Sequence, residues 1–224
     1  RGYHRVGKDP DGFTVNYWYG GAIYAAANAS VNVTGIEFSG NEVPHDGGAI
    51  CMHSLKYNGG GSLRVINCDF HDNKCTGSAG NGGAIFIGRH GNIYVKDTSI
   101  ARNTSAKVVT DESQGTGGIR CYTYGSIQFE GLINITDNFA PETTGGYLPD
   151  SNVRIGKACF STAEVGAGIS ENSKIGIGAQ KRMCDLPGVR LLFSASSKFF
   201  NFDDADLQED KPSVDGNYLV FHYK

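Results

Sequence analysis

Apolar residues recur along this chain at a spacing that predicts pairs of short β-strands. They stand seven, five and two positions ahead of a larger apolar residue: Val31, Val33 and Ile36 before Phe38, and Leu63, Val65 and Cys68 before Phe70. Alternation at period two buries one face of a strand, and the skipped position marks a bend. Helical spacing is not matched, and the content of Val, Ile and Thr favours strands. The pattern predicts an all-β chain.

Each larger apolar residue begins a tetrapeptide, Phe/Ile-x-x-Asn. The starts of the tetrapeptides lie 25, 32, 30, 35 and 34 residues apart, with Gly-Gly pairs between them. A repeat of this length is typical of stacked coils, whose strands pair from one coil to the next. We therefore expect a parallel β-helix of about six coils, with its handedness open. The tetrapeptides are Phe13–Asn16, Phe38–Asn41, Phe70–Asn73, Ile100–Asn103, Ile135–Asn138 and Ile169–Asn172.

The residues of the repeat have predicted structural roles. A Gly-Gly pair permits a sharp turn and a close backbone approach, and the Phe or Ile fills the core. Asparagine tolerates a left-handed backbone, and its amide can bond neighbouring backbone. Stacked in register, the amides should form an asparagine ladder along one edge. Its predicted members are Asn16, Asn41, Asn73, Asn103, Asn138 and Asn172.

The alternation of Gly-Gly-Ala-Ile (residues 20–23, 47–50 and 82–85) with Phe-x-x-Asn resembles a known repeat. It is similar to the repeat of the polymorphic outer membrane protein (Pmp) family of autotransporter adhesins, over residues 13–172. The resemblance implies a right-handed parallel β-helix that is exposed at a cell surface, works in adhesion and has no enzymatic activity. The pairs Gly117-Gly118 and Gly145-Gly146 depart from the motif.

The periodicity fades after Asn172, which predicts two parts. Residues 1–184 should form the β-helix, with an N-terminal cap or first coil, and residues 185–224 a strand-rich cap or assembly segment. An open end of a β-helix exposes unpaired backbone and core side chains, so it needs a cap. Alternatively, the final strand, Asn217–Tyr223, pairs with a neighbouring subunit and builds a filament, with Tyr17–Tyr19 as its counterpart.

Composition limits the cellular compartments and the binding partners that we expect for this protein. A net charge of −3 implies no bulk attraction to nucleic acid or anionic membranes, and no stretch approaches the ~20 apolar residues of a membrane helix. Asn-x-Ser/Thr sequons and six cysteines favour a secreted or cell-surface protein, with extracellular proteins, glycans or other copies as partners. Asn103 belongs to the predicted ladder, so its sequon should be silent. The expected glycosylation sites are Asn28, Asn32 and Asn134.

The cysteines suggest two disulfides. Cys68 and Cys75 flank one tetrapeptide and could close a short loop, and Cys159 and Cys184 could join the last coils to the tail. Cys51 and Cys121 take equivalent places in repeats two coils apart. Because that separation is about 9.6 Å and disulfides need Cα atoms within about 7 Å, we expect two buried thiols in a column with Tyr24 and Phe86.

Two clusters of acidic residues and histidines raise the alternative of a β-helical carbohydrate-active enzyme, a polysaccharide lyase or glycoside hydrolase. Asp69, His71 and Asp72 crowd one turn, and His45 and Asp46 precede a Gly-Gly pair. Paired carboxylates could act as general acid and base, and several could bind Ca²⁺. Such residues are, however, ordinary in exposed turns. We therefore expect a non-catalytic structural or adhesive glycoprotein without metal or cofactor.

Overall fold

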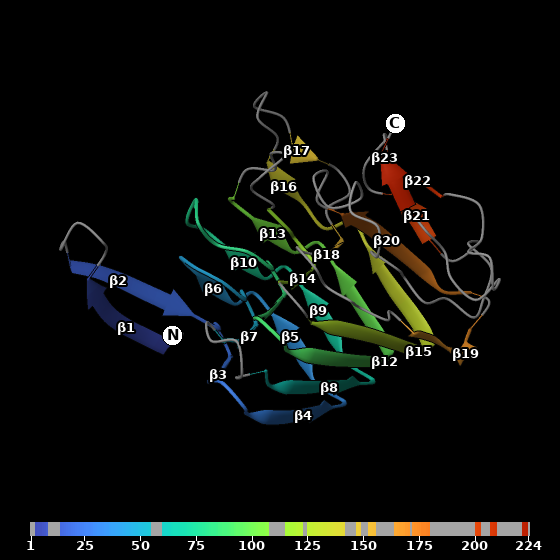
Figure 1. The fold of residues 1–224 in the computed structure, drawn as a ribbon, viewed down its shortest axis with the longest axis horizontal. Coiled ribbons are helices and arrows are strands. Elements are labelled where there is room, and N and C mark those ends of the chain that lie inside the picture. Colours follow the sequence, from blue (N-terminus) through green and yellow to red (C-terminus); the bar gives the residue numbers. More distant parts are fainter. Residues whose placement is uncertain are drawn as a thin grey trace.

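The computed structural model describes an all-β protein whose strands stack in parallel. It describes residues 3–8, 14–54, 60–107, 115–122, 125–141, 147–148, 152–155, 164–170, 172–179, 200–202, 207–209 and 221–223. No helix occurs among these residues, so none there could cross a membrane. Figure 1 shows strands from successive repeats lying side by side, as in a parallel β-helix. The predicted all-β class and parallel pairing are confirmed.

Strands from successive repeats form rows. One row holds β3 (Ile23–Ala25), β7 (Ile50–Met52), β11 (Ile85–Ile87), β14 (Ile119–Cys121) and β18 (Val153–Ile155). Another holds β4 (Ser30–Thr34), β8 (Ser62–Ile66), β12 (Asn92–Ala101), β15 (Ser126–Thr136) and β19 (Glu164–Ile169). After the bend, β5 (Glu37–Ser39) pairs with β9 (Asp69–His71), and β9 pairs with the second half of β12.

A narrower row closes each repeat, and further strands follow toward the C-terminus. The row holds β6 (Glu42–Val43), β10 (Lys74–Cys75) and β13 (Thr104–Ser105). The strand β20 (Lys174–Ala179) pairs with β15, β18 and β21 (Phe200–Phe202). Two antiparallel pairs are β16 (Ala140–Pro141) with β17 (Tyr147–Leu148), and β22 (Leu207–Glu209) with β23 (Phe221–Tyr223).

The register places like residues on one another and so builds the core. Val33 pairs with Val65, Val65 with Val95, and Val95 with Phe129. The rings of Phe38 and Phe70 stack with centroids 4.6 Å apart. The stacked side chains are buried, which is why the alternating pattern was visible in the sequence.

In the pairs Gly20-Gly21, Gly47-Gly48 and Gly82-Gly83, the two glycines have different structural roles. The first, as in Gly47 and Gly82, adopts a positive φ of 72° and 67°. The second lies so close to the next repeat that a side chain cannot fit: a Cβ on Gly48 would stand 1.9 Å from Gly83 O. The pair therefore sets both the turn and the spacing of the stack.

Three details differ from the prediction. The described residues of the first tetrapeptide, 14–16, do not lie in a stacked coil, because β2 (Thr14–Tyr19) pairs antiparallel with β1 (Tyr3–Lys8). In the four tetrapeptides between Phe38 and Asn138, the left-handed residue is the one before the asparagine, as at Asp72 (φ 57°) and Arg102 (φ 56°). The asparagine itself is thereby free to point along the stack.

The third difference concerns the degraded glycine pair. Ile119 pairs with Ile85, so Arg120 stands opposite Phe86, and Cys121 stands opposite Ile87. The predicted column of Cys51, Cys121, Tyr24 and Phe86 is therefore wrong for Cys121. The missing alanine after Gly117-Gly118 shifts the register by one position, which moves a side chain to the other face.

Candidate functional site

An asparagine ladder runs along one edge of the stack, and a chain of ion pairs lies on the surface beside it. Asn41 donates its side-chain amide to Asn73 Oδ1 at 2.8 Å. The same 2.8 Å bond joins Asn73 to Asn103, Asn103 to Asn138, and Asn138 to Asn152. Each of these donors also gives its backbone N–H to the same oxygen, at 3.0–3.1 Å.

The amides of Asn73, Asn103 and Asn138 also reach back to the preceding repeat. The Nδ2 group of Asn73 donates to Phe38 O at 2.8 Å, and that of Asn103 donates to Phe70 O at 2.9 Å. Asn73, Asn103 and Asn138 are fully buried. A buried amide with all its donors and acceptors paired avoids the cost of desolvation, so the ladder ties three successive repeats together at each rung.

The structure brings four predicted members into the ladder and replaces one. Asn41, Asn73, Asn103 and Asn138 belong to it, and Asn152 takes the next position. The backbone of Asn16 pairs with Val6 in the antiparallel hairpin, and Asn172 lies exposed in a turn. Asn152 follows no Phe/Ile-x-x motif, so the tetrapeptide pattern could not find it.

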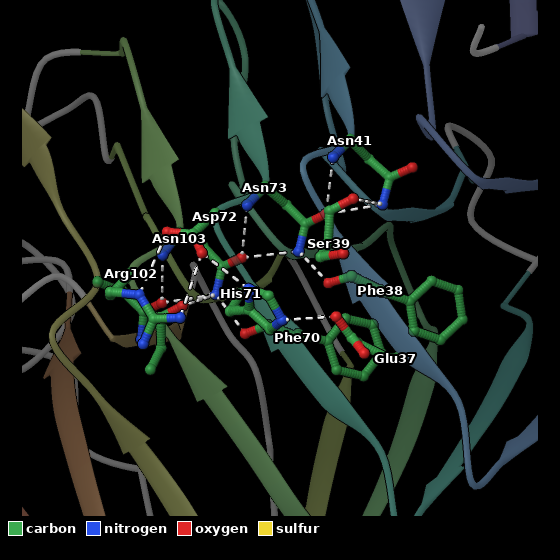
Figure 2. Close-up of polar contacts among 12 residues, drawn as sticks. Glu37, Phe38, Ser39, Asn41, Phe70, His71, Asp72, Asn73, Arg102 and Asn103 are labelled. Atoms are coloured by element: carbon green, nitrogen blue, oxygen red, sulfur yellow. Dashed lines mark hydrogen bonds and ion pairs between the residues drawn. The ribbon is translucent and has the colours of Figure 1, made fainter.

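Four side chains, Glu37, His71, Asp72 and Arg102, form a chain of contacts on the surface beside the ladder (Figure 2). His71 Nε2 lies 3.0 Å from Glu37 Oε1, and His71 Nδ1 lies 2.7 Å from Asp72 Oδ2. Arg102 donates from Nε and an Nη to the two oxygens of Asp72, both at 3.2 Å. Three neighbouring repeats contribute side chains to this chain of contacts, because β5 pairs with β9 and β9 pairs with β12.

The contacts shift the pKa values of these groups in the direction that keeps them charged. The hydrogen bond to Asp72, and then that to Glu37, raises the pKa of His71 above its usual 6.5. The bond from Arg102, and then that from His71, lowers the pKa of Asp72. A carboxylate between two cations is a poor proton donor at neutral pH, so this arrangement favours structure over acid catalysis.

Among the described residues, the surface beside this ion-pair chain is only slightly hollowed. A shallow, open hollow lies beside it, lined by Gly35, Ile36, Glu37, Asn67, Cys68 and Asp69. No group of three or more His, Cys, Asp or Glu side chains within the described part of the chain could hold a metal ion. The hollow could accept a small polar group at the surface, but it leaves most of a bound molecule in water.

A second polar column lies on the outward face of β8, β12 and β15. Arg64 stacks over the ring of Tyr94, with its guanidinium carbon 4.2 Å from the centroid. Glu130 accepts from Tyr94 Oη and from Lys96 Nζ, both at 2.5 Å. Aromatic and charged groups that alternate on a flat sheet can bind glycans or protein surfaces.

A partly buried acid, Asp46, directly precedes the Gly47-Gly48 pair that leads into β7. Asp46 Oδ1 accepts from the backbone and side chain of Asn81, at 2.7 and 3.0 Å. Burial raises the pKa of Asp46 to about 6, and burial lowers the pKa of Lys107 nearby. Shifts of this kind are frequent at catalytic sites, and they also accompany structural pairs.

The cysteines differ from their predicted pairing. Cys68 and Cys75 are both buried free thiols, so the proposed loop disulfide is wrong. Cys68 Sγ contacts Ile66 O at 3.2 Å, and Cys75 Sγ contacts Gly82 O at 3.4 Å, which places the two side chains in different surroundings. Cys51 and Cys121 are buried free thiols too. Cys159 and Cys184 lie outside the described residues.

The sequons fall into two groups. Asn28, Asn32 and Asn134 have exposed side chains, on a turn, on β4 and on β15. Asn103 is fully buried within the ladder. An oligosaccharide requires an accessible amide, so the geometry leaves three of the four sequons available.

Comparison with known proteins gives one similarity. The chain is 38% identical over 90 residues to the probable autotransporter YfaL of Escherichia coli K12, across 40% of this chain. The chain spans only 7% of the length of that protein. No family model matches the sequence, and no solved structure does so.

Proposed function

We propose that this chain is a surface-exposed, non-catalytic β-helical segment that acts in adhesion or as a structural element. The observation that carries the proposal is the continuous asparagine ladder, beside which His71 and Asp72 are held in ion pairs with Glu37 and Arg102. The similarity to a probable autotransporter supports surface exposure. The proposal includes right-handed coiling, about six coils and a Pmp-type repeat.

Further parts of the proposal concern the chain's surroundings. A secreted or cell-surface location would allow glycosylation at Asn28, Asn32 and Asn134, whose side chains are exposed. Extracellular proteins, glycans or other copies would be the partners. The outward column of Arg64, Tyr94 and Glu130 offers stacking and charged groups to a glycan or protein. The C-terminal residues would cap the stack or take part in assembly.

Two measurements on cells and purified protein test this function. Cells that express the native gene are treated with protease while intact, and the chain is followed with an antibody. Purified chain is then tested for binding to immobilised matrix proteins and glycans, with Tyr94→Ala as the variant and Tyr122→Ala as a matched aromatic control. Protection from protease in intact cells would contradict surface exposure, and absence of binding would contradict adhesion.

A carbohydrate-active enzyme is the second candidate, because the carboxylates of Glu37 and Asp69, on adjacent repeats, both line the open hollow. An enzyme should release reducing ends or unsaturated products from a panel of polysaccharides. Loss of such activity in Asp69→Asn, with activity kept in Asp97→Asn, would favour the enzyme and refute the non-catalytic function.

A further inference from the structure

The outward side of four neighbouring strands forms an exposed polar face. Over residues 30–34, 62–66, 92–96 and 126–130, in β4, β8, β12 and β15, the positions that alternate with core residues stand in register from strand to strand. Of the outward residues in these ranges, only Ile66 is aliphatic. We call them the polar face, and its three rows are Ser30, Ser62, Asn92 and Ser126; Asn32, Arg64, Tyr94 and Gln128; and Thr34, Ile66, Lys96 and Glu130.

The polar face carries a cation without an anionic partner in the described part of the chain. Arg64 is exposed, and its guanidinium carbon lies 4.2 Å from the centroid of the Tyr94 ring. The ion pairs among the described residues all join other groups, and the second cation of the face, Lys96, is paired with Glu130. Two cations and one acid give the polar face a net charge of +1, against −3 for the whole chain.

The aromatic ring beneath Arg64 is held in place by the neighbouring strand. Tyr94 Oη donates to Glu130 Oε2, and Lys96 Nζ donates to Glu130 Oε1. These bonds fix the ring and use both oxygens of the only carboxylate on the polar face. The guanidinium therefore lies on an ordered support, while its N–H groups have no competing carboxylate on this face. A cation that is positioned before binding loses less conformational entropy when a ligand arrives.

We propose that the polar face binds an acidic polysaccharide, whose carboxylate or sulfate groups pair with Arg64 and whose hydroxyl groups bond to the neighbouring polar side chains. The planar fork of an arginine donates to two oxygens of such an anion at once. Serine hydroxyls and asparagine and glutamine amides both donate and accept, as sugar hydroxyls require. This inference rests on the proposed adhesive function and adds the class of the partner and the residue that recognises its charge.

Charge and apolar content favour this partner over three others. A neutral glycan would leave Arg64 without a counter-charge. A protein partner would meet few apolar groups, because Ile66 and Tyr94 are the only large apolar side chains on the polar face, and protein interfaces rely on buried apolar anchors. Nucleic acid draws its affinity from many phosphate contacts, whereas the described part of this face offers one cation outside an ion pair.

The test measures binding of the purified chain to immobilised hyaluronan, which carries carboxylates, to dextran sulfate and to neutral dextran by surface plasmon resonance. We expect an acidic polymer to bind at least about tenfold more tightly than dextran, and Arg64→Gln to weaken that binding at least about tenfold. Lys74→Gln is the matched control, because it removes an exposed cation from β10, in another row, and should leave binding unchanged. Because Asn32 stands beside Arg64 and carries a sequon, each protein is also measured with Asn32→Gln, which prevents an attached glycan from covering the face.

Three results would overturn the inference: no binding to either acidic polymer, equal binding to dextran, or equal weakening by Arg64→Gln and Lys74→Gln. Circular dichroism verifies that each variant is folded. Binding to hyaluronan or to dextran sulfate identifies which anionic group is recognised. A chain that is exposed on cells and binds matrix proteins or neutral glycans, but not acidic polymers, would refute this inference while the proposed function stands.

Discussion

Asn73 and Asn103 are joined by two hydrogen bonds to a single oxygen. The backbone N–H and the side-chain amide of Asn73 both donate to Asn103 Oδ1, at 3.0 and 2.8 Å. Both residues are fully buried, so water cannot replace either bond. A ladder of such pairs couples the repeats, and the loss of one rung should be felt in the stability of the whole stack.

Replacement of Asn103 by alanine should destabilise the protein by about 3 kcal/mol, because the backbone N–H of Asn73, one amide hydrogen of Asn73 and the carbonyl of Phe70 each lose a buried hydrogen bond. Asn134→Ala is the control: it also removes a sequon, but its side chain is exposed, so the change should stay within about 0.5 kcal/mol. Urea unfolding followed by circular dichroism measures both. Equal effects would refute the structural role of the rung.

The two kinds of glycine should respond differently to alanine. A Cβ on Gly83 would stand 2.4 Å from both Gly117 O and Thr104 O, so Gly83→Ala should cost about 3 kcal/mol or prevent folding. Gly40 has a φ of 62°, and an added Cβ would have no atom within 4 Å. Gly40→Ala should therefore destabilise the protein only through the strain of a left-handed backbone, by about 1 kcal/mol. Thermal unfolding distinguishes them, and a larger loss at Gly40 would contradict the close-stacking role.

The sequence was informative wherever one residue type had one place in the repeat. Val33, Val65 and Val95 could be assigned to the core because their alternation follows from strand geometry. The ladder could be predicted from Asn41 to Asn138 for the same reason. Asn152 could not be predicted, because it occupies the next position of the ladder without belonging to a Phe/Ile-x-x-Asn tetrapeptide.

Other errors came from local alternatives that a motif does not exclude. The tetrapeptide ending at Asn16 fits the repeat, yet its neighbours also fit an antiparallel hairpin with β1. The spacing of Cys68 and Cys75 fits a loop disulfide, but each thiol packs in a separate part of the interior. The ion-pair chain could not be foreseen as a unit, because only the stacking of the repeats brings Glu37 to His71 and Arg102 to Asp72.

The stability contributed by His71 should depend on pH. Its folded pKa is raised above 6.5, chiefly by Asp72, so the contribution is complete below that value and is lost as pH rises through the folded pKa. We expect the difference in unfolding free energy between wild type and His71→Gln to shrink from pH 6 to pH 8.5. It should stay below about 1 kcal/mol, since the group is near the surface.

An NMR titration of the imidazole measures the pKa of His71 directly.

Arg102→Gln should raise the pKa of Asp72 toward its usual 3.8, since the guanidinium is the main cause of its lowering. Because the lowered pKa of Asp72 stabilises the fold above 3.8 and this contribution is lost as pH falls, the variant should be less sensitive to acid. A pKa of His71 at or below 6.5 would refute the contact chain in solution.

Asp46→Asn should stabilise the protein at neutral pH. The folded pKa of Asp46 is about 6 against a usual 3.8, so the folded state binds the extra proton and wild-type stability falls as pH rises through that interval. The asparagine keeps an oxygen for both donors of Asn81 without the buried charge. We expect the free energy of unfolding to rise by about 2 kcal/mol at pH 7. This is less than the ~3 kcal/mol that corresponds to the full pKa shift of Asp46, because Lys107 and Arg120 lose a counter-charge. The gain should vanish below pH 4 in urea titrations, and a loss of stability at pH 7 would show that the carboxylate is held as a structural anion.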